Sequence, residues 1–285
     1  LALQDRVVTG EPLVSEMIVV TPDTQLLRIV DAIKVLAERL AFPIRVMAET
    51  RLLLDTGNDA NIHVSYTYGL QMALKLLVAS RVRTRFYVTL DADIILLRPL
   101  VLRDLLVENS DDFPGRRAIY EPEPRVVHAQ WWRDSASLLG YLGEEAGSST
   151  FDPTGRGFSV TPALLSTYGS LLVVDALQRR YGPGFKQKWL GEFGTVSGTG
   201  WSEYTLYRLT LDHEGIFNIL HTPEDVSPKL HCHDVWYEDQ LPWDARAAAA
   251  SGCLSSVVQS STGADIQTLR TNLRNVRHTQ NQDEL

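Results

Sequence analysis

Short apolar runs alternate with amphipathic helical patterns over residues 17–90, and this alternation constrains the fold more than any other feature of the sequence. These strand-like runs lie at 17–20, at 44–47, where Arg45 interrupts the apolar residues, and at 86–90, and the helical patterns lie at 24–40 and 70–77. The run at 86–90 is almost continuously apolar, which is typical of a strand buried on both faces of a parallel sheet. Strands that alternate with helices predict an α/β fold in which helices connect parallel strands.

The rest of the chain has a less regular pattern. Candidate strands lie at 157–161, 216–220 and 255–259, and candidate helices at 162–180, 203–213 and 264–277. No internal repeat, low-complexity linker or clean domain boundary separates these segments. We therefore expect one domain over residues 1–285.

The composition of the chain limits the kinds of molecule that we expect it to bind. Hydrophobic residues make up 44% and charged residues 22% of the chain, as in globular proteins with a full core. The net charge of -8 argues against nucleic acid or an anionic membrane surface as the main partner. No apolar run approaches the ~18 residues that a membrane-spanning helix needs. We therefore expect no nucleic-acid partner and no membrane span in this chain.

The cysteines and the last four residues bear on the cellular compartment. Cys232 and Cys253 follow neither a C-x-x-C nor a zinc-site spacing, and two unpaired buried thiols are favoured over a disulfide. Residues 282–285, Gln-Asp-Glu-Leu, resemble the K-D-E-L retention address with its first residue changed. That likeness predicts the lumen of the ER or Golgi, and a chance match would leave a cytoplasmic protein.

Asp91 and Asp93 directly follow the apolar run at 86–90. Two residues apart in extended backbone, their side chains would point to the same side. Two carboxylates that face one point repel each other unless a cation or a proton lies between them. A hard divalent cation such as Mn²⁺ or Mg²⁺ takes oxygen ligands and keeps coordination positions open for phosphate oxygens. The pair therefore predicts a site for a metal and a diphosphate.

Two classes of enzyme place such a motif after such a strand. In haloacid-dehalogenase-type phosphatases the first aspartate, here Asp91, is the nucleophile, and the motif lies on the first strand of the domain. In this chain 90 residues with two candidate strands precede Asp91, which disfavours that class. The phosphatase remains an alternative at this point.

The residues around the motif resemble the second class, the GT-A-type glycosyltransferases. Residues 86–99, FYVTLDADIILLRP, are similar to the strand, the D-x-D motif and the R-P that follows it in that fold. Three further segments resemble a poorly characterised branch of these transferases: YGLQMALKL at 68–76, GFSVTP at 157–162 and WSEYTLY at 201–207.

The resemblance implies a GT-A, Rossmann-like mixed sheet flanked by helices. The donor half would span about 15–125, the acceptor half about 126–263 and a terminal helix about 264–277. The match begins at the second strand of that fold, so we expect a truncated first βα unit. For that reason we assign no residue to the nucleotide base.

The same resemblance implies an activity. The enzyme would move a sugar from a nucleotide-diphosphate sugar, with a UDP-sugar favoured, to a hydroxyl of a glycan, glycoprotein or small-molecule acceptor. Asp91 and Asp93 would bind Mn²⁺ or Mg²⁺ and the donor's diphosphate, and Asp93 would be catalytic with Glu203. A non-catalytic sugar-binding relative is the remaining alternative.

Gln71, Lys75 and Glu203 are the next candidates for the site. Gln71 and Lys75 are four residues apart and share a helix face distinct from the leucine stripe. We expect this face to point at the donor, with Lys75 supplying charge to a phosphate or to Asp93; the alternative is a solvated surface. Glu203 follows a helix-capping Ser202, and the resemblance implies that it contacts the acceptor or takes its proton. The alternative is a structural charge in the first helical turn.

The remaining candidates are weaker. The resemblance implies a C-terminal histidine on the metal, for which His233 is our choice and His231 and His221 are competitors; the alternative for each is a structural hydrogen bond. The polar turn at 259–263 is a candidate contact to the donor. Trp131 and Trp132, with the glycine-rich loop at 191–200, predict either sugar stacking and loop closure or ordinary core and loop.

Overall fold

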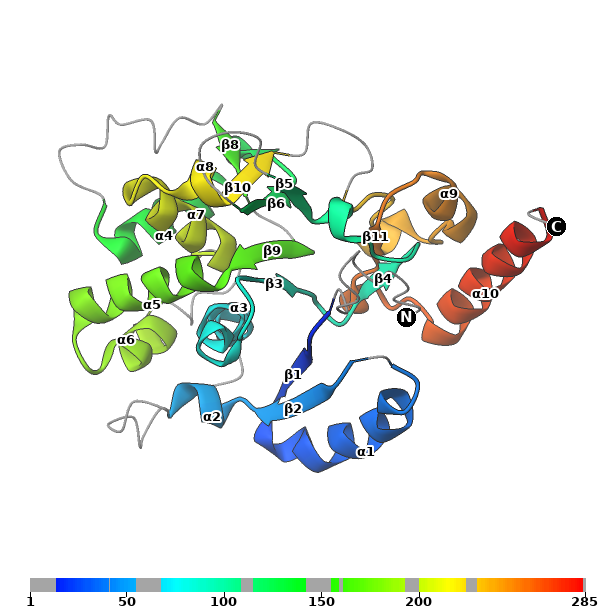
Figure 1. The fold of residues 1–285 in the computed structure, drawn as a ribbon, viewed down its shortest axis with the longest axis horizontal. Coiled ribbons are helices and arrows are strands. Elements are labelled where there is room, and N and C mark those ends of the chain that lie inside the picture. The colour runs from blue at the N-terminus through cyan, green and yellow to red at the C-terminus, as the bar shows by residue number, and fades with distance from the viewer. Residues whose placement is uncertain are drawn as a thin grey trace.

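The computed structural model describes residues 14–40, 42–54, 68–108, 115–141, 155–158, 161–192, 200–223 and 230–283. Within these ranges the chain is an α/β fold of small sheets and surrounding helices (Figure 1). No helix in this described part is long and apolar enough to cross a membrane. Residues 55–67, 193–199 and 284–285 lie outside the description, and with them most of the predicted glycine-rich loop and the end of the Gln-Asp-Glu-Leu motif.

The N-terminal unit is a βαβ arrangement, as predicted. Strand β1 (Met17–Thr21) pairs in parallel with β2 (Ile44–Ala48), from Met17 opposite Ile44 to Thr21 opposite Ala48. Helix α1 (Leu26–Ala37) connects the two strands and contacts β2. The short helix α2 (Thr50–Leu53) follows β2 directly.

The central strand β3 (Phe86–Thr89) differs from its prediction. Its partner among the described residues is β9 (Ala163–Ser166), which runs antiparallel, and Phe86 to Val88 are only half-buried. The expected helix at 162–180 therefore begins later, as α5 (Thr167–Tyr181), because residues 163–166 pair with β3 first. Ser166 ends the strand and caps α5 by accepting a hydrogen bond from the amide of Gly169. The predicted strand at 157–161 is reduced to β8 (Arg156–Gly157), and residues 159–160 lie outside the description.

A three-stranded sheet lies beside this centre. Its order is β10 (His221–Pro223), β6 (Arg116–Tyr120) and β5 (Leu106–Glu108), with β10 parallel and β5 antiparallel to β6. The predicted strand at 216–220 is wrong: these residues mostly form α8 (Phe217–Leu220), and the strand starts at His221. The i, i+3 spacing of the buried Phe217 and Leu220 suits a helical turn that faces the core.

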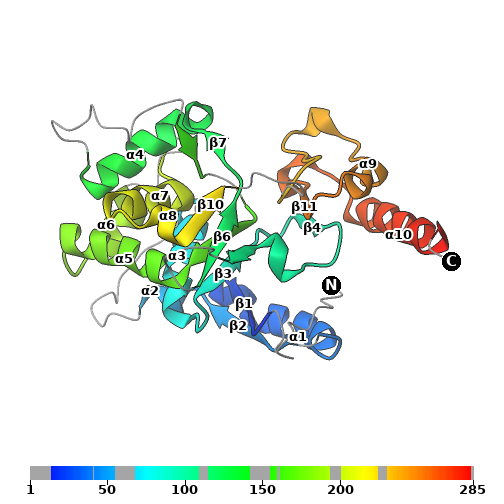
Figure 2. The ribbon, with the colours of Figure 1, turned by 45° about the horizontal axis from the view of Figure 1, so that its top comes forward.

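The C-terminal elements gather at one end of the molecule in both views (Figures 1 and 2). Strand β11 (Ser255–Val257) pairs antiparallel with β4 (Ile94–Leu96), and α9 (Ala245–Ala250) packs on α10 (Ile266–Asp283). The predicted strand at 255–259 and terminal helix are thus confirmed. The expectation of unpaired thiols is wrong, because Cys232 and Cys253 form a disulfide. The spacing of two cysteines does not show that their segments lie side by side.

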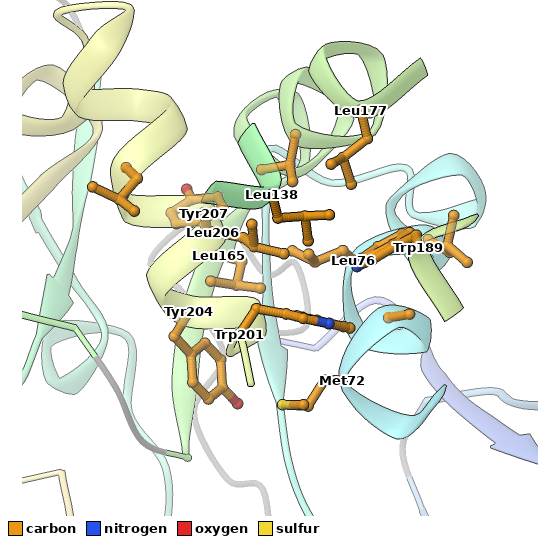
Figure 3. Close-up of a cluster of buried hydrophobic side chains, with 14 of the residues drawn as sticks. Met72, Leu76, Leu138, Leu165, Leu177, Trp189, Trp201, Tyr204, Leu206 and Tyr207 are labelled. Atoms are coloured by element: carbon orange, nitrogen blue, oxygen red, sulfur yellow. The ribbon is translucent and has the colours of Figure 1, made fainter. Parts of the chain in front are cut away.

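The main core is formed by helices packed around β9. Helix α3 (Tyr68–Leu77) supplies the predicted leucine stripe, and α7 (Glu203–His213) spans the residues expected for it. The other contributors are α4 (Ala129–Leu139), α5 and α6 (Phe185–Glu192). Figure 3 shows Leu76 and Met72 of α3 beside Trp201, Trp189 and Leu206. This cluster draws on residues from 47 to 220, so both predicted halves share one core.

Candidate functional site

Asp91 and Asp93 lie in the turn between β3 and β4. Strand β3 ends at Thr89, and the amide of Ile94 donates to the carbonyl of Asp91 at 3.3 Å. The predicted extended backbone is therefore wrong at this point, because residues 92–93 form a turn before β4, which pairs with β11. The hydrogen-bond and ion-pair partners of the two carboxylates come from different parts of the chain.

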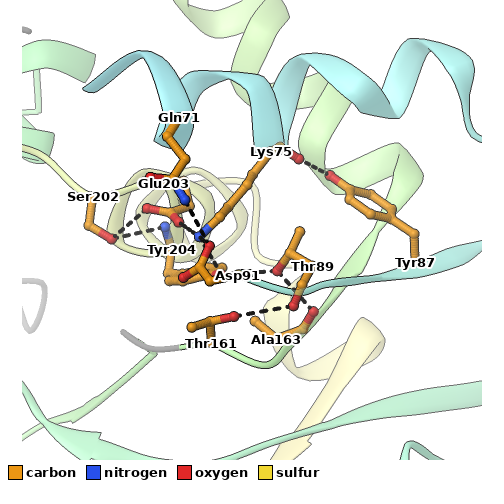
Figure 4. A network of polar contacts seen from close by, with 10 residues as sticks. All are labelled: Gln71, Lys75, Tyr87, Thr89, Asp91, Thr161, Ala163, Ser202, Glu203 and Tyr204. Carbon is orange, nitrogen blue, oxygen red and sulfur yellow. Dashed lines mark hydrogen bonds and ion pairs between the residues drawn. The ribbon is translucent and has the colours of Figure 1, made fainter. Parts of the chain in front are cut away.

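Helix α3 holds Asp91. Lys75 Nζ lies 2.7 Å from Asp91 Oδ1, and Gln71 Nε2 donates to the same oxygen at 3.1 Å (Figure 4). The shared helix face predicted for Gln71 and Lys75 is confirmed. Lys75 was expected beside Asp93 or a phosphate, and the structure instead places it against Asp91.

Lys75 also reaches Glu203, the first residue of α7. Its Nζ lies 2.8 Å from Glu203 Oε1, and the side chains of Lys75 and Glu203 are only 14% and 3% exposed. Burial alone would lower the pKa of Lys75, but the neighbouring Glu203 and Asp91 raise that pKa well above its ordinary value. Lys75 is therefore a fixed positive charge between two carboxylates.

Both carboxylate oxygens of Glu203 are engaged inside the protein. Oε1 faces Lys75, and Oε2 accepts a hydrogen bond from Ser202 Oγ at 3.2 Å. Ser202 in turn caps α7 by accepting from the amide of Tyr204, which confirms the predicted cap. In this arrangement Glu203 faces Lys75 rather than solvent, and its contact with an acceptor stays a prediction.

The C-terminal segment holds Asp93. The amide of Ser260 donates to Asp93 Oδ2 at 3.3 Å, and the amide of Val258 donates to the Asp93 carbonyl at 3.1 Å. Ser260 begins a short 3-10 turn, Ser260–Thr262, within the polar segment predicted near the donor. That segment therefore meets the motif, and its contact with a donor stays a prediction.

A buried hydroxyl network under these charges was missed in the sequence. Tyr204 OH lies 2.9 Å from Thr89 Oγ1 and 3.4 Å from Lys75 Nζ, and Tyr87 OH donates to the Lys75 carbonyl at 2.8 Å. Figure 4 shows these side chains joining β3, α3 and α7. Tyr87 and Thr89 are two residues apart in β3 and share one face, and this period of two was the available signal.

The three candidate histidines do not gather around Asp91 and Asp93. His221 is buried, its Nε2 lies 2.7 Å from Tyr207 OH, and burial together with Arg208 lowers its pKa to about 3. His231 Nδ1 pairs with Asp234, while its Nε2 lies 3.5 Å from Glu121 Oε2.

His233, our choice for the metal, is exposed and has a left-handed backbone with φ of 55°. Its backbone carbonyl accepts a hydrogen bond from Ser256 Oγ at 2.9 Å. Within the described ranges no cluster of three or more His, Cys, Asp or Glu residues is placed to bind a metal. The sequence alone does not show where each histidine lies, because that position depends on how the strands pair.

The predicted aromatic surface is only partly available. Trp132 is buried in the core, with the guanidinium of Arg125 4.4 Å from its ring centroid. Trp131 is half-buried and stacks on His128, with 3.9 Å between ring centroids. Trp132 is therefore an ordinary core residue, which was the alternative to sugar stacking.

The charge balance of the site suits a cation. Among the residues that the structure describes in this site, Asp91, Asp93 and Glu203 bring three negative charges and Lys75 brings one positive charge. The contacts described above use Oδ1 of Asp91 and Oδ2 of Asp93, and the other oxygen of each has no hydrogen bond to a described residue. Two carboxylates with one open oxygen each are ligands that Mg²⁺ or Mn²⁺ accepts.

Comparison with known proteins gives a family but no function. A family model matches residues 8–281, which is nearly the whole chain. This chain belongs to DUF6492, a family of unknown function. No curated protein and no solved structure matches it.

Proposed function

We propose that this protein is a metal-dependent glycosyltransferase that moves a sugar from a nucleotide-diphosphate sugar, with UDP-sugars first, to an acceptor hydroxyl. The observation that carries the proposal is the Asp91–Asp93 turn, in which each carboxylate keeps one open oxygen beside a surplus of negative charge. The likeness of residues 86–99 and 201–207 to GT-A-type transferases supports the same reaction.

Asp91 and Asp93 would hold the Mn²⁺ or Mg²⁺. When bound, such a cation neutralises the diphosphate and stabilises it as a leaving group. Phosphate and water oxygens complete the coordination of such ions in many enzymes, so the proposal does not depend on His233. Asp93 is the better residue to test, because Asp91 also pairs with Lys75 and Gln71.

Lys75 and Glu203 would fix the position of the Asp91 side chain from the protein interior. Lys75 holds the Asp91 carboxylate in place, and its fixed charge offsets part of the repulsion between the carboxylates. Glu203 fixes the position of Lys75 through a buried ion pair. For Glu203 to take a proton from an acceptor it would have to leave Lys75, so we assign it first to holding Lys75.

A thermal-shift screen tests the proposal. UDP-, GDP- and CMP-sugars would be added with and without Mn²⁺, and a ligand that binds the folded state raises the melting temperature. We expect stabilisation by a UDP-sugar only with Mn²⁺, and loss of both stabilisation and transfer in Asp93→Ala. The control is Asp31→Asn on α1, an exposed carboxylate whose pairing with Lys34 contributes little.

The alternatives give different results in the same series. A phosphatase would form an aspartyl-phosphate or beryllofluoride adduct on Asp91 and would not be stabilised by nucleotide sugars. A non-catalytic relative would bind donor with Mn²⁺ but turn over no acceptor. Full activity of Asp93→Ala under strict chelation would remove the metal from the proposal.

A further inference from the structure

Tyr68 occupies the outer end of the helix face that holds Asp91. It is the first residue of α3, one turn before Gln71 and two turns before Lys75, so the three side chains share a face. Gln71 and Lys75 both contact Asp91 Oδ1. Lys75 lies deep on this face, whereas Tyr68 is 64% exposed. Tyr68 is thus the solvent-exposed end of this helix face.

The hydroxyl of Tyr68 lies near the charged side chains of the site but is not bonded to them. It has no hydrogen bond to any residue that the structure describes. Desolvation and the nearby carboxylates of Glu203, Asp91 and Asp93 raise the pKa of Tyr68 to about 12. The hydroxyl therefore keeps its proton at neutral pH and is available as a hydrogen-bond donor.

We propose that Tyr68 binds the diphosphate of the donor, with its hydroxyl donating a hydrogen bond to a phosphate oxygen. This inference rests on the proposed function, because it needs an anion at Asp91 and Asp93. A diphosphate drawn there by a cation comes within reach of Tyr68, which lies on the helix face whose Gln71 and Lys75 contact Asp91.

A single-atom change tests this contact. Tyr68→Phe removes the hydroxyl and keeps the ring, and the exposed position makes a folding defect unexpected. Dissociation constants for UDP and for inorganic pyrophosphate, each with Mn²⁺, would be measured by titration calorimetry. We expect both to rise by about tenfold, the effect of losing a hydrogen bond to a charged group.

Tyr168 provides a matched control. It is also exposed, at 61%, and also lies in the first turn of a helix, α5. It follows Ser166, which pairs with Phe86 at the amino end of β3, so it lies toward the edge opposite Asp91. Tyr168→Phe is expected to bind both ligands as the wild type does.

Three results would overturn the inference. Unchanged dissociation constants in Tyr68→Phe would exclude the hydroxyl contact. Weaker UDP binding with unchanged pyrophosphate binding would place the hydroxyl on the nucleoside. Unchanged binding in Tyr68→Phe with a loss in Tyr68→Leu would assign the role to the ring. If the wild type bound no nucleotide sugar, UDP or pyrophosphate with Mn²⁺, the proposed function itself would fail, which is a different outcome.

Discussion

Lys75 and Glu203 are 128 residues apart in the sequence, yet Lys75 Nζ and Glu203 Oε1 lie 2.8 Å apart in a largely buried ion pair. The pair joins α3 to α7, and through Asp91 it joins both helices to the turn after β3. Removing one member of such a pair leaves an uncompensated buried charge, whereas replacing both by apolar residues removes the problem.

This relationship predicts strong coupling between the two positions. Lys75→Met should lower the free energy of unfolding by about 3 kcal/mol, because it leaves the buried Glu203 unpaired. Glu203→Leu should cost less, because Lys75 keeps its pair with Asp91, and the double variant should lose less than the sum of the two single variants. The coupling energy is measured by urea unfolding of the wild type, the two single variants and the double variant. Additive losses would show that the two charges do not stabilise each other in solution.

The buried His221 predicts a loss of stability in acid. Its pKa is lowered to about 3 in the folded state from 6.5 when unfolded, so the unfolded chain binds the extra proton first. As pH falls from 6.5 toward 3, this group should lower the free energy of unfolding by roughly 1.4 kcal/mol per pH unit.

His221→Gln should flatten that pH dependence even if the variant is less stable overall. Denaturant unfolding between pH 7 and pH 4 measures the slope in both proteins. An equal slope in the wild type and His221→Gln would assign the acid sensitivity to other groups.

The disulfide predicts sensitivity to reduction at the C-terminal end. Cys253 lies in a small core with Trp243 and Val235, and the bond joins it to Cys232 across 21 positions. For a loop of this size a disulfide contributes about 3 kcal/mol, so dithiothreitol should lower the melting temperature. A Cys232→Ser, Cys253→Ser variant should melt at the reduced temperature with or without reductant. Two free thiols in the untreated protein would contradict the pairing.

Gly169 predicts a steric defect inside the main core. A Cβ atom at this position would lie 2.8 Å from a ring carbon of Tyr207, which is fully buried. Gly169→Ala should therefore cost about 1–3 kcal/mol despite the better helix propensity of alanine. Gly184→Ala is the control, because nothing lies within 4 Å of a Cβ atom there. Equal melting temperatures for the two variants would show that Tyr207 moves freely aside.

Features set by neighbouring residues could be predicted from the sequence. The spacing of Gln71 and Lys75 gave their common face, and Ser202 marked the start of α7. Features set by distant pairing were missed. Residues 163–166 have a pattern that also suits a helix, and only β3 makes them a strand. In the same way, nothing near Asp91 in the sequence shows that α3 would hold it while Ser260 holds Asp93.

The hydrogen bond from Ser260 to Asp93 spans 167 positions, and it has a consequence for how the protein is made. A ribosome that has just added Asp93 has produced the complete motif but not the segment that fixes Asp93. The paired carboxylates reach their final arrangement only when the last part of the chain emerges and β11 joins β4. A nascent or prematurely terminated chain therefore carries the motif without the assembled site.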